Sequence, residues 1–401
     1  MGQNQSSLDK RKSSIDVDGI LYELTEKTKE ACITGFISNN QNQIYIPRSI
    51  QVKKKEYLVT AIYRNTFHYA SFQSIQFDPD SPLQLIAEEA FSYSMLESIT
   101  IPSNVFIICE GAFTSCRQLK SVNFASNNQL QMIEKNSFSK SSIESISIPK
   151  RLTEISESTF YSCEQLKHVE FHPNSELQTI QKNAFRSSSI ESIFVPFTVQ
   201  RIGEFAFYSC KNLKKFDIPV NSHLYEIGKN AFSCSSIESI SLPSNMRNLA
   251  DGWCSGTFHL KEIKVVPIGD ERVKFVDGNF LVGKSDPKND LCDILHFARR
   301  DIEEAVIPYY VQRIAPSAFA NCIRLKRVVF PEDSQISVID KEAFYFSSIE
   351  SIYIPKTVTK VCESAFSSCR KLKRVEIPKD FDLQRISNGA FEDCTNDIIR
   401  V

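Results

Sequence analysis

The sequence predicts a repeat solenoid of roughly fourteen coils, because phenylalanine recurs with a period in the twenties along most of the 401 residues. From Phe91 onward the undisturbed steps alternate between 22 and 25 residues, so two kinds of coil take turns. The repeat positions are Phe67, Phe91, Phe113, Phe138, Phe160, Phe185, Phe207 and Phe232, followed after a disturbance by Phe319, Phe344, Phe366 and Phe391. Because a solenoid lengthens without starting a new core, the length alone does not imply several globular domains.

Each coil is expected to begin with a short strand in which apolar and polar residues alternate, as around Ile146 and Ile148 or around Val169 and Phe171. One face of such a strand points inward. A Leu-x-x-Ile step and an Ala-Phe or Thr-Phe pair then supply inward residues for the other walls of the coil. Parallel strands of successive coils would form one sheet, and a stacked phenylalanine from each coil would form a continuous buried ladder.

The residue that follows the first inward residue of each strand alternates strictly between glutamate and lysine. On neighbouring strands these side chains would lie side by side, where opposite charges attract and like charges repel. We interpret the alternation as a device that fixes the register of the coils. The series is Glu97, Lys120, Glu144, Lys167, Glu191, Lys214, Glu238, Lys261, Glu303, Lys326, Glu350 and Lys373.

Three segments follow from the pattern. Residues 1–16 are polar and are predicted to be disordered, and residues 17–66 are predicted to form a capping hairpin and a first coil. Residues 67–401 carry the repeats, with a hairpin inserted around 276–299. Because the chain stops at Val401 within the last expected strand, self-association at that C-terminal edge is a further expectation.

Recurrent Leu-x-x-Ile, Ala-Phe-x-x-Cys and Ile-Pro steps, as in 206–210 and 365–369, resemble the BspA-like (Treponema-type) leucine-rich repeat family. The resemblance covers about residues 17–401. It implies an α/β, right-handed leucine-rich repeat solenoid with one parallel β-sheet on the concave face and short strands or 3-10 segments elsewhere. Members of this family are implicated in adhesion to host proteins and cells, and they occur on bacterial and protist surfaces.

No motif in the sequence indicates catalysis or cofactor binding. A nucleophile elbow, a glycine-rich phosphate loop and a zinc-protease motif are all missing from the sequence. Six of the twelve cysteines follow the repeat phenylalanine by three residues, and we expect these to be small buried thiols that fill a corner of the coil. We therefore predict neither an enzyme nor a metal or cofactor site. The net charge of −1, without a clustered basic surface, argues against nucleic acid as a partner.

The N-terminus carries the most specific motif. Gly2 and Ser6 fit the pattern for N-myristoylation, and the basic cluster Lys10, Arg11 and Lys12 follows. One acyl chain with a basic cluster would give peripheral membrane association. The segment has no apolar core of a signal peptide, and no run of apolar residues is long enough to span a membrane. The sequence thus favours a cytoplasmic or inner-leaflet location, with the cell surface as the alternative.

The outward positions of the strands are mostly small or polar, with a few exceptions that make candidates for a binding face. These candidates are Phe194, Arg327, Val329, Tyr353 and Arg374. The sequence therefore predicts a non-enzymatic module for protein–protein interaction with an unknown protein ligand. A membrane-anchored scaffold and a surface adhesin that binds host or extracellular-matrix proteins both remain open, and an enzyme with an unannounced site is the third possibility.

Overall fold

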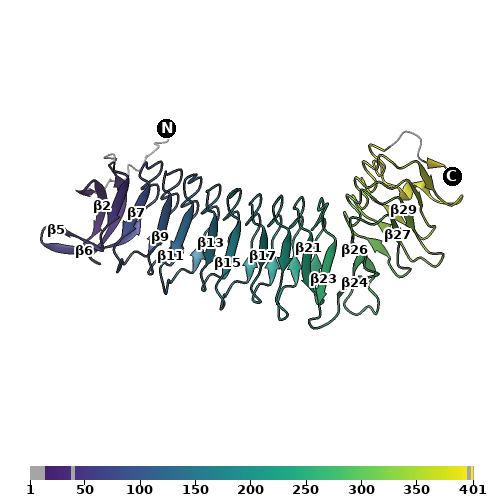
Figure 1. Ribbon diagram of the computed structural model, residues 1–401, viewed down its shortest axis with the longest axis horizontal. Coiled ribbons are helices and arrows are strands. Elements are labelled where there is room, and N and C mark those ends of the chain that lie inside the picture. Colours follow the sequence, from purple (N-terminus) through teal and green to yellow (C-terminus); the bar gives the residue numbers. More distant parts are fainter. Residues whose placement is uncertain (1–13, 38–40, 395–398, 401) are drawn as a thin grey trace, which may run out of the picture. The chain divides into compact units, whose positions relative to one another are not determined.

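The computed structural model describes residues 14–37, 41–394 and 399–400. The chain divides into two compact units, Met1–Gln165 and Leu166–Val401. Each unit is a β-solenoid (Figure 1), so the predicted repeat architecture of about fourteen turns is confirmed. The α/β label fits only loosely, because the described residues contain one short 3-10 helix, η1 (Leu383–Arg385), and no α-helix.

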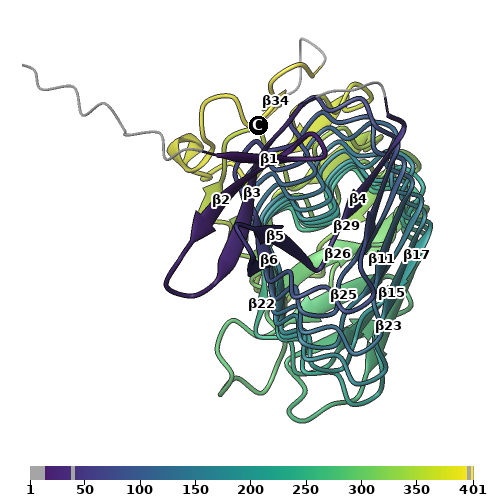
Figure 2. The same cartoon turned by 90° about the vertical axis from the view of Figure 1, so that its left-hand side faces the viewer.

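In the first unit, three antiparallel strands lie at the N-terminal end (Figure 2): β1 (Ile15–Val17), β2 (Ile20–Thr25) and β3 (Glu30–Phe36). The hairpin of β5 (Ser49–Val52) and β6 (Lys55–Ile62) continues this sheet, because β6 pairs in parallel with β3. The coils that follow form two walls, each made of parallel strands. The long strands are β4 (Gln43–Ile46), β7 (Ser74–Phe77), β9 (Ser98–Ile101), β11 (Ser121–Phe124) and β13 (Ser145–Ile148). The short strands are β8 (Leu85–Ile86), β10 (Ile107–Ile108), β12 (Met132–Ile133) and β14 (Glu154–Ile155).

The second unit repeats both walls and interrupts them once. Its long strands are β15 (His168–Phe171), β17 (Ser192–Phe194), β19 (Lys215–Asp217), β21 (Ser239–Pro243) and β23 (Glu262–Val266), then β27 (Glu304–Val306), β29 (Arg327–Val329), β31 (Ser351–Tyr353), β33 (Arg374–Glu376) and β34 (Ile399–Arg400). Its short strands are β16 (Thr179–Ile180), β18 (Arg201–Ile202), β20 (Glu226–Ile227) and β22 (Asn248–Leu249), then β28 (Arg313–Ile314), β30 (Val338–Ile339) and β32 (Lys360–Val361). Between these sets lie β24 (Val273–Val276), β25 (Phe280–Gly283) and β26 (Ile294–Ala298), which pair antiparallel. β34 pairs with β33, and self-association at this end stays a prediction.

The wall that carries the repeat phenylalanines is a hydrogen-bonded turn rather than a strand. The Phe113 amide donates to the Ser137 carbonyl of the next coil at 2.7 Å, and the Ser115 amide donates to the Ser139 carbonyl at 2.8 Å. Two residues of each coil, placed two before and two after the phenylalanine, have positive φ, such as Ser158 (56°) and Ser162 (52°). Ser, Asn and Gly are the commonest residues at these positions, and of the three Gly and Asn adopt the left-handed region at the least cost.

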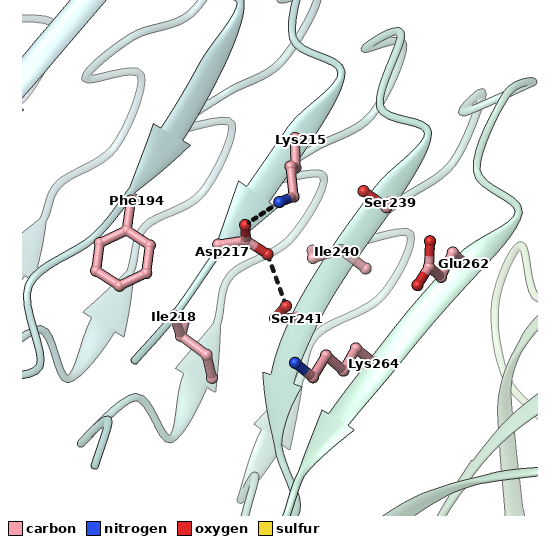
Figure 3. A pocket seen from close by; sticks show the side chains of 9 residues that line it. All are labelled: Phe194, Lys215, Asp217, Ile218, Ser239, Ile240, Ser241, Glu262 and Lys264. Carbon is pink, nitrogen blue, oxygen red and sulfur yellow. Dashed lines mark hydrogen bonds and ion pairs between the residues drawn. The ribbon is translucent and has the colours of Figure 1, made fainter. Parts of the chain in front are cut away.

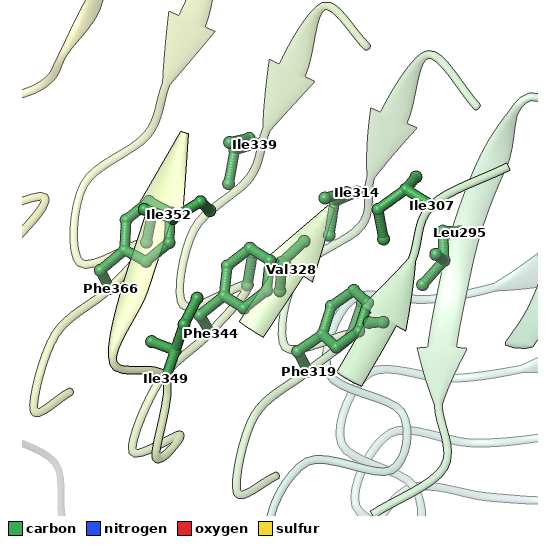
Figure 4. Packing of buried hydrophobic residues seen from close by; sticks show 14 of the residues in the cluster. Leu295, Ile307, Ile314, Phe319, Val328, Ile339, Phe344, Ile349, Ile352 and Phe366 are labelled. Atoms are coloured by element: carbon green, nitrogen blue, oxygen red, sulfur yellow. The ribbon is translucent and has the colours of Figure 1, made fainter. Parts of the chain in front are cut away.

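The phenylalanine rings stack directly on one another between adjacent coils (Figure 4). Phe91 and Phe113 lie 5.0 Å apart with an interplanar angle of 4°, and Phe344 and Phe366 lie 4.9 Å apart at 3°. Both pairs are fully buried. The predicted ladder is therefore confirmed within each of these runs of coils.

The expectation of a ladder without a break is wrong at the insertion. The coil after Phe232 supplies Trp253, whose ring meets Phe232 edge-on at 89° and 6.4 Å. Beyond it the buried guanidinium of Arg300 bridges the gap, because its Nη1 donates to the Ala318 carbonyl at 2.9 Å and its Nη2 to the Cys254 carbonyl at 3.4 Å. A cation and backbone carbonyls thus replace ring stacking where the extra strands separate two coils.

Within each unit the alternating charges lie side by side, except between Lys261 and Glu303 at the insertion. The Lys326 amide donates to the Glu303 carbonyl at 2.8 Å, and the two side chains form an ion pair at 3.1 Å. Lys214 and Glu238 pair at 3.9 Å in the same way. Since all these side chains are largely exposed, we take the pairs as determinants of register rather than of stability.

Five of the six repeat cysteines are buried thiols, as predicted, whereas Cys394 is half-buried, and no cysteine of the chain forms a disulfide. The Cys163 thiol donates to the Phe138 carbonyl at 3.1 Å, and Cys116 and Cys210 repeat this contact in their own coils. Burial raises the pKa of each of these three thiols to about 11. The thiol thus caps a carbonyl in the corner of the coil and is a poor nucleophile.

Replacing one ring of the ladder should strongly destabilise the fold. We expect Phe113→Ala to lower the free energy of unfolding by about 3–5 kcal/mol, because a large buried side chain leaves a cavity between rigid neighbours. Chemical denaturation measures this, and Phe194→Ala, which removes an exposed ring, is the matched control. A loss below about 1 kcal/mol for Phe113→Ala would contradict the packing described here.

Thiol labelling should follow burial. In the folded protein at mildly alkaline pH, iodoacetamide should modify the exposed Cys234 well before Cys116, Cys163 and Cys210, whose raised pKa values keep them protonated. Peptide mass spectrometry follows each site, and denatured protein gives the unprotected rates. Equal labelling of Cys163 and Cys234 in the folded state would show that the corner is open.

Candidate functional site

Four successive strands of the second unit place outward side chains in registered rows. In the first row Glu304 of β27 lies opposite Arg327 of β29, which lies opposite Ser351 of β31, which in turn lies opposite Arg374 of β33. The next row, two residues further along each strand, contains Val306 opposite Val329 and Tyr353 opposite Glu376. Because of this register, residues that lie far apart in the sequence form one surface.

The structure brings four of the five predicted binding-face residues together in these rows. We call the surface formed by Arg327, Val329, Tyr353 and Arg374, together with Val306, the Tyr353 patch. Val306 and Tyr353 are about half exposed, at 54% and 48%, while Val329 is half-buried. The patch thus combines an apolar row with a row that contains two guanidinium groups.

Both arginines of the Tyr353 patch already have carboxylate partners. Arg374 Nε lies 2.7 Å from Glu376 Oε1 on the same strand, and Arg327 Nη1 lies 3.9 Å from Glu304 Oε1 on the neighbouring strand. Their charges are therefore balanced locally, which favours contacts with a polar protein surface over capture of a free anion. Val306 was missed by the sequence reasoning, although its place two residues after Glu304 could have identified it.

Phe194 belongs to a different part of the long-strand wall. Its strand β17 is the first strand of the sheet β17–β19–β21–β23, whereas the Tyr353 patch lies on β27, β29, β31 and β33. Its ring is 59% exposed and stands at one end of a hollow of about 350 Å³ (Figure 3). The hollow is lined by Phe194, Lys215, Asp217, Ile218, Ser239, Ile240, Ser241, Glu262 and Lys264.

The hollow exists because β21 carries serine at both outward positions. Ser239 lies opposite Lys215 of β19 and Glu262 of β23, and Ser241 lies opposite Lys264 of β23. Two short side chains between two strands of long charged ones leave a depression along β21. The sequence shows these serines plainly, but the depression depends on which strands are neighbours.

The two sides of the hollow differ in how their charges are satisfied. On β19 the Lys215 Nζ lies 2.7 Å from Asp217 Oδ2, and the Ser241 hydroxyl donates to Asp217 Oδ1 at 2.8 Å. The hydrogen bond to Asp217 raises the pKa of Lys215. On β23 the side chains of Glu262 and Lys264 form no hydrogen bond or ion pair with any described residue, although the Glu262 carboxylate contributes electrostatically to the raised pKa of Lys215. The β23 side therefore presents two charges that remain available.

The other predicted sites cannot be placed. Gly2 and the basic cluster Lys10, Arg11 and Lys12 lie outside the described residues, so acylation and membrane association stay predictions. Within the described residues, no helix combines the length and apolar character needed to cross a bilayer. In the same part of the chain, no three His, Cys, Asp or Glu side chains gather in a group suited to a metal ion.

Solved structures share this fold at low sequence identity. A leucine-rich repeat protein from Bacteroides ovatus is 20% identical with a TM-score of 0.59, over 96% of this chain and 100% of that one. A leucine rich cell surface protein from Faecalibacterium prausnitzii is 20% identical with a TM-score of 0.52, over 92% and 96% of the two chains. No curated protein matches the chain in sequence.

Family assignment rests on the repeats themselves. The model of the BspA type leucine rich repeat region, which describes six copies of the repeat, matches residues 36–167, 84–192, 168–271 and 295–401. These ranges include most of both units and the strands that carry the Tyr353 patch. The motifs that suggested the resemblance, such as 206–210 and 365–369, fall within them. The chain therefore belongs to the BspA-type leucine-rich repeat family.

Proposed function

We propose that this chain is a non-enzymatic protein-binding solenoid whose long-strand wall contacts the partner through the Tyr353 patch. The observation that supports the proposal is the pair of registered rows, in which exposed Val306 and Tyr353 lie beside Arg327 and Arg374. Tyrosine and arginine are enriched among residues that dominate binding energy at protein interfaces. Repeat solenoids of this kind commonly bind partners along such an extended surface.

An enzymatic function has no comparable support. The hollow on β21 is lined mostly by polar side chains, and its Lys215–Asp217 pair is a partly exposed ion pair rather than a buried acid or base. Reactive side chains in active sites usually have strongly perturbed protonation in a water-poor cleft. A binding role accounts for the same residues without further assumptions.

Two settings for a binding role compete. Gly2 and the basic cluster 10–12 support an intracellular scaffold held at the inner leaflet of a membrane. The description of the Faecalibacterium prausnitzii neighbour as a cell surface protein supports the alternative, a surface adhesin for host or matrix proteins. We favour the scaffold, because the motif belongs to this chain whereas the description belongs to a distant relative.

The Tyr353 patch can be tested by substitution without disturbing the core. We expect Tyr353→Ala and Arg327→Glu each to weaken binding of a partner isolated from the native cell by about tenfold or more, as for interface hot spots. Affinity is measured on the purified pair, with thermal melts to show that the fold persists. Tyr345→Ala, which removes another exposed tyrosine outside the patch, is the matched control. Unchanged affinity in both patch variants would rule out this surface.

The setting can be tested on the N-terminal peptide of protein purified from its native cell. For the scaffold we expect the mass of this peptide to include a myristoyl group on Gly2, and we expect Gly2→Ala to release the protein from the membrane fraction. An unmodified glycine together with labelling of the protein on intact cells would instead favour the adhesin.

A further inference from the structure

The long-strand wall has an open edge at β23 (Glu262–Val266). Among the described strands, β23 pairs only with β21 and ends the sheet β17–β19–β21–β23, while the next sheet of this wall begins at β27. Within the second unit the amide of each charged ladder residue donates to the carbonyl of its predecessor, as Lys261 does to Glu238 at 3.0 Å. No such bond joins Glu303 to Lys261, although both residues are described. The inserted strands have therefore separated two coils that would otherwise be paired.

The open edge presents backbone groups that another strand could use. The Glu262 amide donates to the Glu238 carbonyl at 3.2 Å, so Glu262 faces β21. Because successive residues of a strand direct their backbone groups to opposite sides, Ile263 and Val265 face the open side. Unpaired edge strands of this kind are the usual sites at which an extended peptide adds itself to a sheet.

The side chains of β23 determine which charges such a peptide must carry. Glu262 lies opposite Ser239 and Lys264 lies opposite Ser241, so the β21 side offers no charge directly beside either of them. On the other side no described strand pairs with β23. Elsewhere in the wall comparable charges are paired, as in Arg374–Glu376 at 2.7 Å and Arg327–Glu304 at 3.9 Å. Glu262 and Lys264 are thus opposite charges two residues apart, both facing outward and both without an ion-pair partner (Figure 3).

We propose that the open edge of β23 accepts an extended peptide segment of a partner protein that carries a basic and an acidic side chain two residues apart. A strand has the same period as β23, so its basic group would lie beside Glu262 and its acidic group beside Lys264. The residue between them points inward, like Ile263, and is expected to be apolar. In the parallel arrangement of the wall the motif is basic–apolar–acidic, the pattern already present at 215–217 and 374–376.

This inference deepens the proposed function, since it names the chemistry of one partner segment, but it uses other strands than the Tyr353 patch. Loss of partner binding in Tyr353→Ala and loss of peptide binding at β23 are therefore separable results. The probes are two short threonine-flanked peptides with blocked ends, one with a central Lys-Val-Glu and one with Glu-Val-Lys. Fluorescence anisotropy of the labelled peptides with the full-length protein gives both affinities.

We expect the protein to prefer Lys-Val-Glu by about tenfold, because two cross-strand pairs change from attraction to repulsion in the other order. The double variant Glu262→Lys/Lys264→Glu keeps the net charge and should invert the preference. The double variant Lys341→Glu/Glu363→Lys reverses an exposed ion pair outside the hollow and should leave the preference unchanged. Bound peptide should also slow amide hydrogen exchange in 262–266.

Three results would overturn the proposal. The first is the absence of saturable binding by either peptide, and the second is a preference that survives the swap on β23. The third is undiminished binding of a peptide N-methylated at alternate residues, since pairing at the edge requires those amides. Slow exchange in 262–266 without peptide, together with a dimer mass by light scattering, would show instead that a second copy of the chain occupies the edge.

Discussion

The fold depends on one hydrogen bond that recurs from coil to coil, the donation from the amide of a repeat phenylalanine to a carbonyl of the following coil. At 2.7 Å for Phe207 and Ala231, it holds the phenylalanine wall at a fixed spacing. The rings can then stack at 5.2 Å with an angle of 7° between Phe207 and Phe232. No coil has a core of its own, so each contributes only a layer that its neighbours complete.

This hydrogen bond also explains the composition of the turn that carries the phenylalanine. Every second amide of the turn donates to the next coil, as those of Asn183, Phe185 and Ser187 do, and the amides between them donate within the turn. A turn with this pattern has a left-handed residue on each side of the phenylalanine. Positive φ at Asn183 and Ser187, on either side of Phe185, is the result. Bulky residues at such positions, for example Tyr69 and Tyr93, are the exceptions and lie stacked on the outside at 5.0 Å. Backbone hydrogen bonds thus hold the turn, and the side chains at these positions only have to be compatible with positive φ.

Most of the architecture was predictable because its signals repeat. The spacing of phenylalanine, the buried cysteine corner and the alternation of Glu and Lys each appear in many coils. An atypical residue in one coil therefore does not obscure the pattern. The failures occur where a feature appears once. Trp253 and the buried Arg300 interrupt the ladder, and nothing in the sequence distinguishes Arg300 from a surface arginine before its neighbours are known.

The candidate surfaces also differ in how far the sequence predicts them, according to whether they depend on the repeat or on a feature that occurs once. Arg327, Val329, Tyr353 and Arg374 could be grouped because the repeat fixes which residues of adjacent strands are opposite. The grouping of Phe194 with them was an expectation from residue type alone, and the structure assigns it to another sheet. The available charges of Glu262 and Lys264 depend on a missing neighbour. A periodic sequence cannot show an absent pairing, because the charge alternation continues in phase across the insertion from Lys261 to Glu303.

That continuity has a consequence for how such a chain can change in length. Deleting or duplicating a single coil would bring two like charges together at the junction, glutamate beside glutamate or lysine beside lysine, whereas a change of two coils preserves every attraction. Two coils correspond to 47 residues, the distance from Phe113 to Phe160. The unit that can be gained or lost without creating a like-charge contact is therefore the pair of coils. Recombination between the repeats should yield solenoids whose numbers of coils differ by two.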